Sequence, residues 1–307
     1  MPCVEILLAT CNSSRFLSQQ LDSLLAQDHS DIRIVVRDDG SEDGTRDIVG
    51  QYASRDGRIS LLEDHTPSGS AKSNFFKLLA ASRADYVMTC DADDWWYPDK
   101  VSRTLLEMQK LEDGSPSVPC LVHCDLAVAD EDLNVISPSL VKYEKMSPER
   151  TALNQLVCQN VVTGCAMMVN RALVSMIGPE PCAVMHDWWC ALIASAFGRI
   201  SFIKIPLIKY RQHSSNQVGA YNASEPSVLA SRLSARERNR AVYDSMFRQA
   251  GAFADEYSDI LSEEQLKVLR GYSDMVKLNH FQRCGRIISG NYWKNTFIRN
   301  VGQFLII

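Results

Sequence analysis

Three carboxylates stand close together at Asp91-Ala92-Asp93-Asp94, directly after the apolar run at residues 86–90. Side chains two residues apart in an extended chain point to the same side, so Asp91 and Asp93 can face one ligand. Ionised carboxylates at the end of a buried strand require a cation or water. A divalent metal that carries a diphosphate meets this requirement, because hard cations bind carboxylate and phosphate oxygens together. The alternative is a set of solvated carboxylates at a helix N-terminus, where the helix dipole favours negative charge.

A second acidic pair, Asp38-Asp39, is followed by Gly40-Ser41 and then by Asp43. One interpretation is a turn that leads into a helix capped by Asp43, because Asp, Gly and Ser favour turns and caps. The other is a nucleoside site, in which one carboxylate accepts the N3–H of a pyrimidine base and the other binds a ribose hydroxyl. The motif alone leaves both interpretations open.

Two further motifs combine ionisable and aromatic side chains, His186-Asp187-Trp188-Trp189 and Tyr210-Arg211-Gln212-His213. Asp187 precedes an apolar run, so it either caps a helix above buried tryptophans or acts as a general base. Aromatic neighbours exclude water from a carboxylate and raise its pKa, as a base requires. Trp188 and Trp189 would then offer stacking surfaces to a sugar ring. His213 is either structural or an additional metal ligand beside the carboxylates.

The elements that must position these motifs alternate between short apolar runs and amphipathic segments, which predicts a parallel sheet with helices on both faces. Predicted strands span residues 4–9, 32–36, 59–62 and 86–90, and predicted helices span 43–53, 70–81 and 98–111. Another helix carries the leucine stripe at 17, 21, 24 and 25 after a cap at Ser13 or Ser14. Ligands of such sheets bind beyond the carboxyl ends of the strands. We therefore expect residues 10–12, 38–41 and 91–94 to form one site.

The pattern becomes mixed after the break at Gly114-Ser115-Pro116. It predicts strands at 121–128, 161–169 and 200–205, a helix at 187–197, a mobile loop at 211–225, and helices at 229–250 and 262–284. We expect an α/β domain at residues 1–225, with a nucleotide-binding half at 1–113 and an acceptor-binding half at 114–225. A helical region at 226–307 follows.

Composition narrows the class of protein. The 307 residues carry a net charge of −5 without a basic block, which argues against a nucleic-acid partner. The ten cysteines include no Cys-x-x-Cys pair, so we expect reduced core thiols in a cytoplasmic protein. The first residues do not resemble a signal peptide, and no run of about 18 apolar residues could cross a membrane. No Gly-x-Gly-x-x-Gly follows the first predicted strand, which disfavours a dinucleotide cofactor.

Together these motifs resemble the family 2 inverting glycosyltransferases of the GT-A fold. The resemblance covers roughly residues 3–215, and its blocks follow the family's order: Thr10 and Asn12, residues 38–41, residues 69–74, residues 91–94 with Trp96, Thr163-Gly164-Cys165, residues 186–189 and residues 210–213. The last three blocks look most like bacterial rhamnosyltransferases, which use dTDP-L-rhamnose to build surface polysaccharides. Ala92 stands where many rhamnosyltransferase-like chains have a longer polar residue. This difference weakens the assignment of the donor sugar and does not affect metal binding.

The resemblance implies a role for each block. The donor-binding residues would be Thr10, Asn12, Asp38, Asp39, Lys72 and Asp91. Asp93 and His213 would bind Mg²⁺ or Mn²⁺ between the protein and the two phosphates of the donor. Asp187 would be the catalytic base. The acceptor would lie against Thr163, Gly164, His186, Trp188 and Trp189.

These expectations describe an inverting, metal-dependent glycosyltransferase that acts on a glycan or lipid-linked acceptor in bacterial surface polysaccharide synthesis. The expected donor is dTDP-β-L-rhamnose, and the alternative is a UDP-sugar, because thymine and uracil present the same N3–H. A sugar-1-phosphate nucleotidyltransferase would carry a glycine-rich basic loop after the first strand, where residues 10–14 read Thr-Cys-Asn-Ser-Ser. A non-catalytic scaffold that binds nucleotide sugars is a further alternative.

The C-terminal segment carries an apolar stripe composed of Trp293, Phe297, Val301 and Phe304 or Leu305, with Lys294 and Arg299 nearby. One interpretation is that this helix packs on the protein's own core or on a second subunit, which would make a homodimer. The other is peripheral contact with the inner face of the cytoplasmic membrane, where a lipid-linked acceptor would lie.

Overall fold

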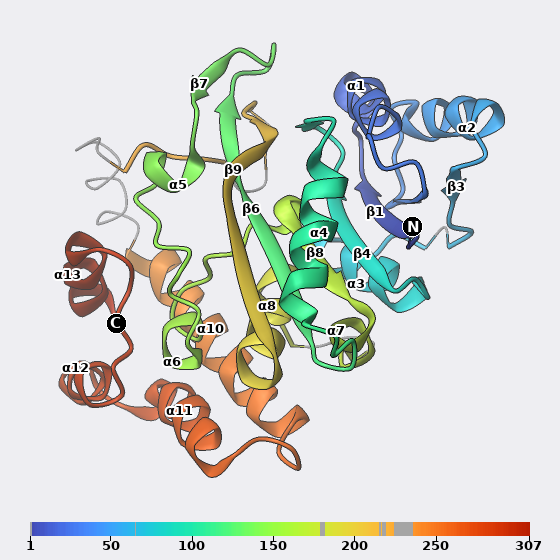
Figure 1. The fold of residues 1–307 in the computed structure, drawn as a ribbon. Helices are drawn as coiled ribbons and strands as arrows, with labels where there is room; N and C mark the ends of the chain where they lie inside the picture. The colour runs from blue at the N-terminus through green and yellow to red at the C-terminus, as the bar shows by residue number, and fades with distance from the viewer. Residues whose placement is uncertain (1, 65, 179–181, 215, 217–218, 224–235) are drawn as a thin grey trace.

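The computed structural model describes residues 2–64, 66–178, 182–214, 216, 219–223 and 236–307. Its described part is built around a nine-stranded sheet with helices on both faces, which confirms the predicted α/β arrangement (Figure 1). In chain order the strands are β1 (Val4–Thr10), β2 (Ile32–Asp38), β3 (Ile59–Leu61), β4 (Tyr86–Asp91), β5 (Trp95–Trp96), β6 (Cys120–Ala129), β7 (Val135–Ser137), β8 (Met167–Asn170) and β9 (Arg199–Arg211). Their order in the sheet is β3-β2-β1-β4-β8-β6-β9-β5, with β7 paired to β6.

Most of the sheet is parallel. β3, β2, β1 and β4 run in one direction, and β6 and β9 are parallel to each other. β8 is inserted between β4 and β6 and is antiparallel to both. The parallel register places the ends of β1, β2 and β4 at the same edge of the sheet, since Thr10 pairs with Asp38 and Ala9 pairs with Asp91.

The two faces of the sheet belong to two separate hydrophobic cores, because successive side chains of a strand point to opposite faces. In β1, Leu7 belongs to one core, whereas Ile6 and Leu8 belong to the other. Val87 and Met88 of β4 are divided in the same way. All of β6 is buried, as expected for a strand covered on both faces.

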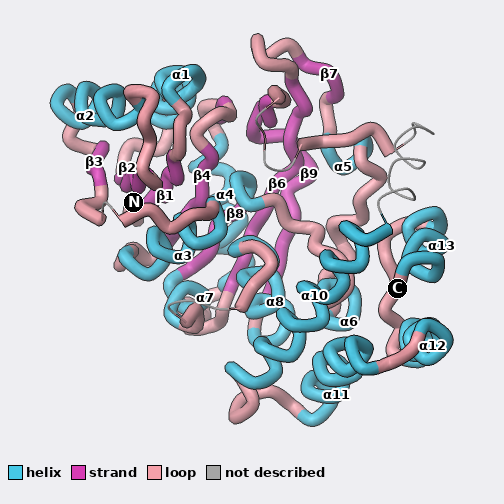
Figure 2. Tube along the Cα trace, turned by 180° about the vertical axis from the view of Figure 1, so that it is seen from behind, coloured by secondary structure: helices cyan, strands magenta, loops and turns pink. Residues whose placement is uncertain are grey.

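The helices are divided between the same two cores. The core that contains Ile6 is completed by α1 (Ser14–Leu25), α2 (Thr45–Arg55), α4 (Lys100–Glu112) and α5 (Leu140–Tyr143). The core that contains Leu7 is completed by α3 (Ala71–Ala81), α6 (Leu153–Leu156), α7 (Arg171–Ser175), α8 (His186–Phe197), α10 (Arg236–Glu256), α11 (Glu263–Ser273), α12 (His280–Ser289) and α13 (Phe297–Ile306). Seen from behind, α10 to α13 lie together beyond α8 (Figure 2). No helix within the described ranges combines the length and the apolar character that a membrane crossing requires.

The strand predicted at residues 161–169 is confirmed only at its end, where β8 spans Met167–Asn170. The chain instead makes a 3₁₀ turn, η1 (Gly164–Ala166), and β8 begins only at Met167. The Thr89 hydroxyl donates a hydrogen bond to the Gly164 carbonyl oxygen at 2.6 Å, which fixes this turn against β4. The apolar run at 161–169 is buried for the most part, but its first six residues do not join the sheet.

The helix predicted at 262–284 is interrupted. α11 is followed by a 3₁₀ turn, η2 (Asp274–Lys277), and α12 starts after Asn279, whose side chain accepts a hydrogen bond from the Gln282 amide. This Asn-x-x-Gln capping box is a start signal within the apolar periodicity. Part of the helix predicted at 229–250, and part of the loop predicted at 211–225, lie outside the described residues.

Several elements were not predicted from the sequence. The strands β5 and β7 and the helices α5 to α7 have two to five residues each, which is too few to show a period. β9 is longer than the predicted strand at 200–205, since it continues through Pro206 with irregular register against β6. This extension carries Tyr210 and Arg211 to the edge of the sheet where β4 ends.

Gly198 joins α8 to β9 and allows a close approach of two chain segments. A Cβ atom at this position would lie 1.7 Å from the Pro119 carbonyl oxygen, which is far inside van der Waals contact. The neighbouring Arg199 amide donates to the same oxygen at 2.9 Å, so the Pro119 carbonyl cannot move away without losing this bond.

We therefore expect Gly198→Ala to lower the free energy of unfolding by roughly 1–3 kcal/mol, measured by urea denaturation. Gly50→Ala is the matched control, because Gly50 lies in α2 with no heavy atom near the added Cβ. It should leave stability unchanged or raise it by about 0.5–1 kcal/mol. Equal denaturation midpoints for the two variants would contradict the packing argument.

Candidate active site

A cavity of about 700 Å³ lies beyond the carboxyl ends of β1, β2 and β4 and is closed on its other side by the start of α8. Nine of the residues singled out in the sequence line it: Thr10, Asp39, Asp91, Asp93, Thr163, Gly164, His186, Asp187 and Trp188. The sheet register explains why strand-end residues 28 to 82 positions apart in the chain meet here, since Thr10 pairs with Asp38 and Ala9 pairs with Asp91.

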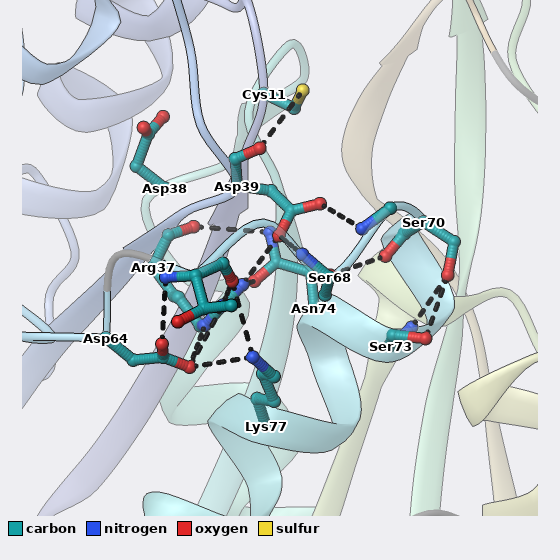
Figure 3. Close-up of polar contacts among 12 residues, drawn as sticks. Cys11, Arg37, Asp38, Asp39, Asp64, Ser68, Ser70, Ser73, Asn74 and Lys77 are labelled. Atoms are coloured by element: carbon teal, nitrogen blue, oxygen red, sulfur yellow. Dashed lines mark hydrogen bonds and ion pairs between the residues drawn. The ribbon is translucent and has the colours of Figure 1, made fainter.

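Asp39 is the carboxylate of the β2 end that faces the cavity. The fully buried Arg37 donates to Asp39 Oδ1 at 2.8 Å, and the Ser68 and Gly69 amides donate to Oδ1 and Oδ2 at 2.5 and 3.1 Å. On its other edge Arg37 is paired with Asp64 at 3.0 Å, as Figure 3 shows. Burial raises the pKa of Asp39, but the hydrogen bonds from Arg37 and Ser68 outweigh it and leave this pKa below its ordinary value. Asp39 is therefore an ionised acceptor at the cavity wall.

Three residues expected to bind the donor have other partners and do not line the cavity. Asp38 is buried and points away from Arg37, and it accepts hydrogen bonds from the Thr10 hydroxyl at 3.0 Å and the Ser41 amide at 3.0 Å (Figure 3). Asn12 accepts a bond from the Glu42 amide at 2.9 Å in a left-handed conformation with φ of 48°. The Lys72 ammonium donates to the Ala183 carbonyl oxygen at 3.0 Å. Asp38 and Asn12 thus hold the loops around the site in place, and Lys72 connects α3 to the segment before α8.

The acidic residues after β4 are concentrated in a poorly hydrated place. Burial, followed by the nearby negative charges of Asp93 and Asp187, raises the pKa of Asp91 to about 7. Asp94 is completely buried; its Oδ1 accepts from the Arg211 amide at 3.0 Å, whereas its Oδ2 has no hydrogen-bond partner among the residues that the structure describes. Burial, followed by the negative charges of Asp93 and Asp91, raises the pKa of Asp94 well above its ordinary value. The tip of β4 therefore favours a state in which its negative charge is neutralised.

Arg211 holds this acidic tip in place, a role that the sequence did not reveal. Its side chain is almost completely buried and donates from Nε to the Asp93 carbonyl oxygen at 2.6 Å and from Nη2 to Gln19 Oε1 at 2.7 Å. A third bond runs to the Glu131 carbonyl oxygen. Because these bonds go to backbone and amide oxygens, they fix the loop without forming an ion pair with the carboxylates.

The residues at the tip fit a divalent cation. His213 Nε2 lies 2.8 Å from Asp93 Oδ2, so the two expected metal ligands, which are 120 positions apart in the chain, are in contact. Asp91 and Asp94 lie close by with Cys165, and the unpartnered oxygen of Asp94 shows that hydrogen bonds within the described chain do not fully satisfy the cluster. Carboxylate oxygens with one imidazole are the donor set that Mg²⁺ and Mn²⁺ accept.

Asp187 lies across the cavity, in the first turn of α8. Its carboxylate is largely buried and accepts a hydrogen bond from the Trp188 amide at 2.6 Å. Burial raises the pKa of Asp187 to about 7, although hydrogen bonds from Trp188, the Asn160 side chain and the Gly164 amide lower it in part. A carboxyl group that titrates near neutrality and faces a cavity is suited to accept a proton.

The residues expected at the acceptor side differ in their exposure to the cavity. A Cβ on Gly164 would lie 2.9 Å from the His186 ring, so this position requires glycine. The His186 ring stacks on Phe75 with centroids 4.0 Å apart, and neither ring nitrogen has a hydrogen-bond partner among the described residues. Burial lowers the pKa of His186 to about 3, so the ring is neutral. Trp188 lines the cavity, and its indole donates to the Leu156 carbonyl oxygen at 2.6 Å.

Trp189 does not offer the expected stacking surface. It is completely buried, and its indole donates to the Tyr257 hydroxyl at 3.3 Å and packs edge-on against Phe253. Adjacent residues of a helix point about 100° apart, so Trp188 and Trp189 cannot both face one cavity. The buried-tryptophan interpretation therefore holds for Trp189.

Comparisons with known proteins agree with this geometry. The family model described as "Glycosyl transferase family 2" matches residues 5–174, more than half of the chain. The dTDP-rhamnosyl transferase RfbG of Shigella flexneri is 25% identical over 226 residues, which cover 69% of this chain and 74% of RfbG. Among solved structures, S. aureus TarS 1-349 in complex with UDP-GlcNAc has a TM-score of 0.54 at 14% identity, covering 98% of this chain and 90% of TarS 1-349. The mannosyltransferase PcManGT from Pyrobaculum calidifontis, in complex with GDP-Man and Mn²⁺, has a TM-score of 0.52 at 17% identity. This match covers 94% of this chain and 79% of PcManGT. The structural likenesses confirm the expected GT-A fold.

The raised pKa of Asp187 predicts how stability depends on pH. A folded-state value of about 7, above the ordinary 3.8, means that the fold favours the protonated carboxyl group. Its contribution to stability is complete below about pH 4 and is lost as the pH rises through about 7. Asp187→Asn removes this titration, so its advantage over the parent in free energy of unfolding should grow by roughly 2–3 kcal/mol between pH 5 and pH 8.

Urea denaturation at both pH values measures this difference. Asp259→Asn is the control, because Asp259 is exposed and far along the chain from the cavity residues. It should show no such pH dependence. A constant difference between Asp187→Asn and the parent at both pH values would show that the carboxyl group at 187 is not desolvated as described.

Proposed function

Because the chain belongs to glycosyl transferase family 2 and is a glycosyltransferase, we propose that it moves a sugar from a nucleotide-sugar donor to an acceptor hydroxyl with inversion at the anomeric carbon. The observation that carries this proposal is the shared cavity, in which the acidic tip of β4 and the carboxyl group of Asp187 face the same space. The donor diphosphate would lie at the first, and the acceptor at the second.

Asp39 is the residue we propose to read the nucleobase. Its Oδ1 already accepts two hydrogen bonds, from Arg37 and Ser68, whereas Oδ2 accepts one, from Gly69. A carboxylate oxygen can accept two, so Oδ2 has room for the N3–H of thymine or uracil. The buried Arg37 keeps the carboxylate ionised and oriented. Asp91, which lines the same cavity, would contact the ribose.

Asp93 and His213 would hold a divalent cation, as their contact of 2.8 Å and the position of Asp93 at the cavity wall suggest. Such a cation would neutralise the charge that develops on the departing diphosphate. Arg211 and Asp94 then have a positioning role, because they fix the backbone from which Asp93 projects. The Mn²⁺ in the PcManGT complex accords with this assignment.

Asp187 would act as the general base. With a pKa of about 7 it can be ionised at neutral pH and still bind a proton strongly. It would take the proton of the acceptor hydroxyl as that oxygen attacks the anomeric carbon from the side opposite the leaving group. One such displacement converts a β-linked donor into an α-linked product. The neutral His186 offers ring nitrogens that could bind a second hydroxyl of the acceptor.

The donor sugar that we propose is L-rhamnose, carried by dTDP, for transfer to a glycan or lipid-linked acceptor of a surface polysaccharide. Its support is the resemblance of residues 163–165, 186–189 and 210–213 to rhamnosyltransferases and the similarity to RfbG. A UDP-sugar is the second candidate, since Asp39 would accept the same hydrogen bond from uracil. We keep the division into a nucleotide-binding half at 1–113, an acceptor-binding half at 114–225 and a helical region at 226–307 as part of this proposal.

Asp187→Asn should lower the rate constant of sugar transfer by about 10²–10⁴-fold, because an amide cannot accept the proton. Its affinity for the nucleotide should change little, since Asp187 lies on the acceptor side. Single-turnover transfer assays and calorimetric titration with the nucleoside diphosphate measure the two quantities. Parental turnover by Asp187→Asn would rule out Asp187 as the base, and Asp259→Asn controls for the loss of an aspartate elsewhere.

A thermal-shift screen tests the donor and the metal together. A ligand that binds only the folded state at 100 times its Kd stabilises that state by about 2.7 kcal/mol. With Mn²⁺ present, dTDP-rhamnose should raise the melting temperature more than UDP-sugars do, and Asp93→Asn should lose the Mn²⁺-dependent part of that shift. A larger shift with a UDP-sugar would favour the second donor. No shift with any nucleotide sugar, for a folded parent protein, would contradict donor binding itself.

A further inference from the structure

The last two helices of the chain differ in charge from the rest of the molecule. Residues 277–307 contain five lysines and arginines and no aspartate or glutamate, in a chain whose net charge is −5. Lys277 and Arg286 are exposed, and Lys277 is paired with Asp274, which precedes this segment. This end of the protein therefore presents positive charge to its surroundings.

The same helices expose apolar side chains at helical spacing. On α13, Phe297, Val301 and Leu305 recur every four residues and are all exposed, with Phe297 at 83% of its full accessible surface. On α12, Phe281 and Ile288 lie seven residues apart, with Phe281 exposed at 84%. Residues four and seven apart lie on one side of a helix, so each helix has an apolar stripe that faces solvent.

The opposite sides of these helices explain how the stripes come to be exposed. Phe304 of α13 packs on Trp293, with ring centroids 5.7 Å apart, and both contact the core that α8 and α10 share. The Arg283 side chain of α12 donates to the Ile307 carbonyl oxygen at 3.3 Å, which joins the two helices. Figures 1 and 2 both place α12 and α13 next to each other at the edge of the molecule. The C-terminal segment therefore packs on the protein's own core through Trp293 and Phe304, while its other apolar side is uncovered within the described chain.

The helix pair is connected to the rim of the cavity. Arg299 of α13 donates to the Glu144 carbonyl oxygen at 2.8 Å and to the Tyr221 hydroxyl. Glu144 is itself one of the residues that line the cavity. A surface bound by α13 would thus lie near the mouth of the site, on the part of the chain that follows β6 and not on the nucleotide-binding side.

We propose that α12 and α13 form an interfacial helix pair that binds an anionic lipid bilayer. Exposed aromatic and aliphatic side chains would enter the region between headgroups and acyl chains, and Lys277 and Arg286 would contact anionic headgroups. A second copy of the chain is a poorer match, because a twofold contact would bring each basic stretch against its own equivalent. The proposal rests on the proposed function only in that a membrane would present a lipid-linked acceptor to the cavity.

Vesicle flotation with the full-length protein tests this inference. The parent should float with vesicles that contain roughly 30 mol% phosphatidylglycerol, bind at least 10-fold less to pure phosphatidylcholine, and detach as salt is raised, because charges at a surface are screened. The double variant Phe281→Ser, Phe297→Ser and the single variant Arg286→Glu should each reduce the partition coefficient at least 10-fold. Ile260→Ser is the matched control and should float like the parent, since Ile260 is an exposed apolar residue outside α12 and α13.

Three results would overturn the inference. The first is a parent protein that does not bind anionic vesicles, and the second is a double variant that floats like the parent. The third is a dimer in light scattering that the double variant abolishes, with no binding to vesicles. The last result would assign the apolar stripes to a second copy of the chain. The nucleotide-sugar thermal shift of the double variant should equal that of the parent, so a failure of membrane binding is distinguishable from a failure of the proposed function.

Discussion

The site depends on concentrated negative charge that the protein holds in place without neutralising it. Asp91, Asp93 and Asp94 follow β4 directly, and within the described chain their only ion-pair partner is His213. The guanidinium of Arg211 is bound to this loop, but it donates its hydrogen bonds to carbonyl and amide oxygens and not to the carboxylates. Desolvated carboxylates without a counter-charge are costly, so this arrangement is stable only when protons or a cation compensate it. A structure selected for stability alone would place an arginine against these carboxylates.

The sheet makes this concentration of charge feasible, because the hydrophobic cores that stabilise the fold lie on its two faces and the site lies at one edge. Its two faces bury two extensive cores, and most of the helices that complete them lie outside the cavity wall, to which only α3, α5 and α8 contribute within the described chain. The reversed strand β8 lies between the β1–β4 side and the β6–β9 side, and the turn that precedes it supplies Gly164 beside His186 and Asp187. The donor side of the cavity is thus built from strand ends, whereas the acceptor side is built from a turn and a helix N-terminus.

This difference determines how much could be predicted from the sequence. Strand ends in a parallel sheet can be predicted from the sequence, because each apolar run followed by polar residues marks one. The topology then brings these ends together. Asp39, Asp91 and Asp93 were identified in this way. The roles of residues whose partners are distant in the chain could not be predicted from the sequence. Asp38 looks equivalent to Asp39 until its bonds to Thr10 and Ser41 are known. The pairing of Trp189 with Tyr257 depends on a residue 68 positions later, directly after α10. Arg211 was noticed only as a member of the motif at 210–213, and Asn160 belonged to no motif, because their roles arise from contacts with Asp93 and Asp187.

The bonding of Asp39 has a consequence for which nucleotides the cavity can tolerate. With Arg37, Ser68 and Gly69 all donating to it, this carboxylate remains deprotonated well into acid and presents only lone pairs to an incoming ring. Cytosine also carries a lone pair at N3, so the two would repel each other, and neither can supply the missing hydrogen. If Asp39 binds the base as proposed, electrostatic repulsion at the cavity wall excludes donors that contain cytosine, whatever sugar they carry.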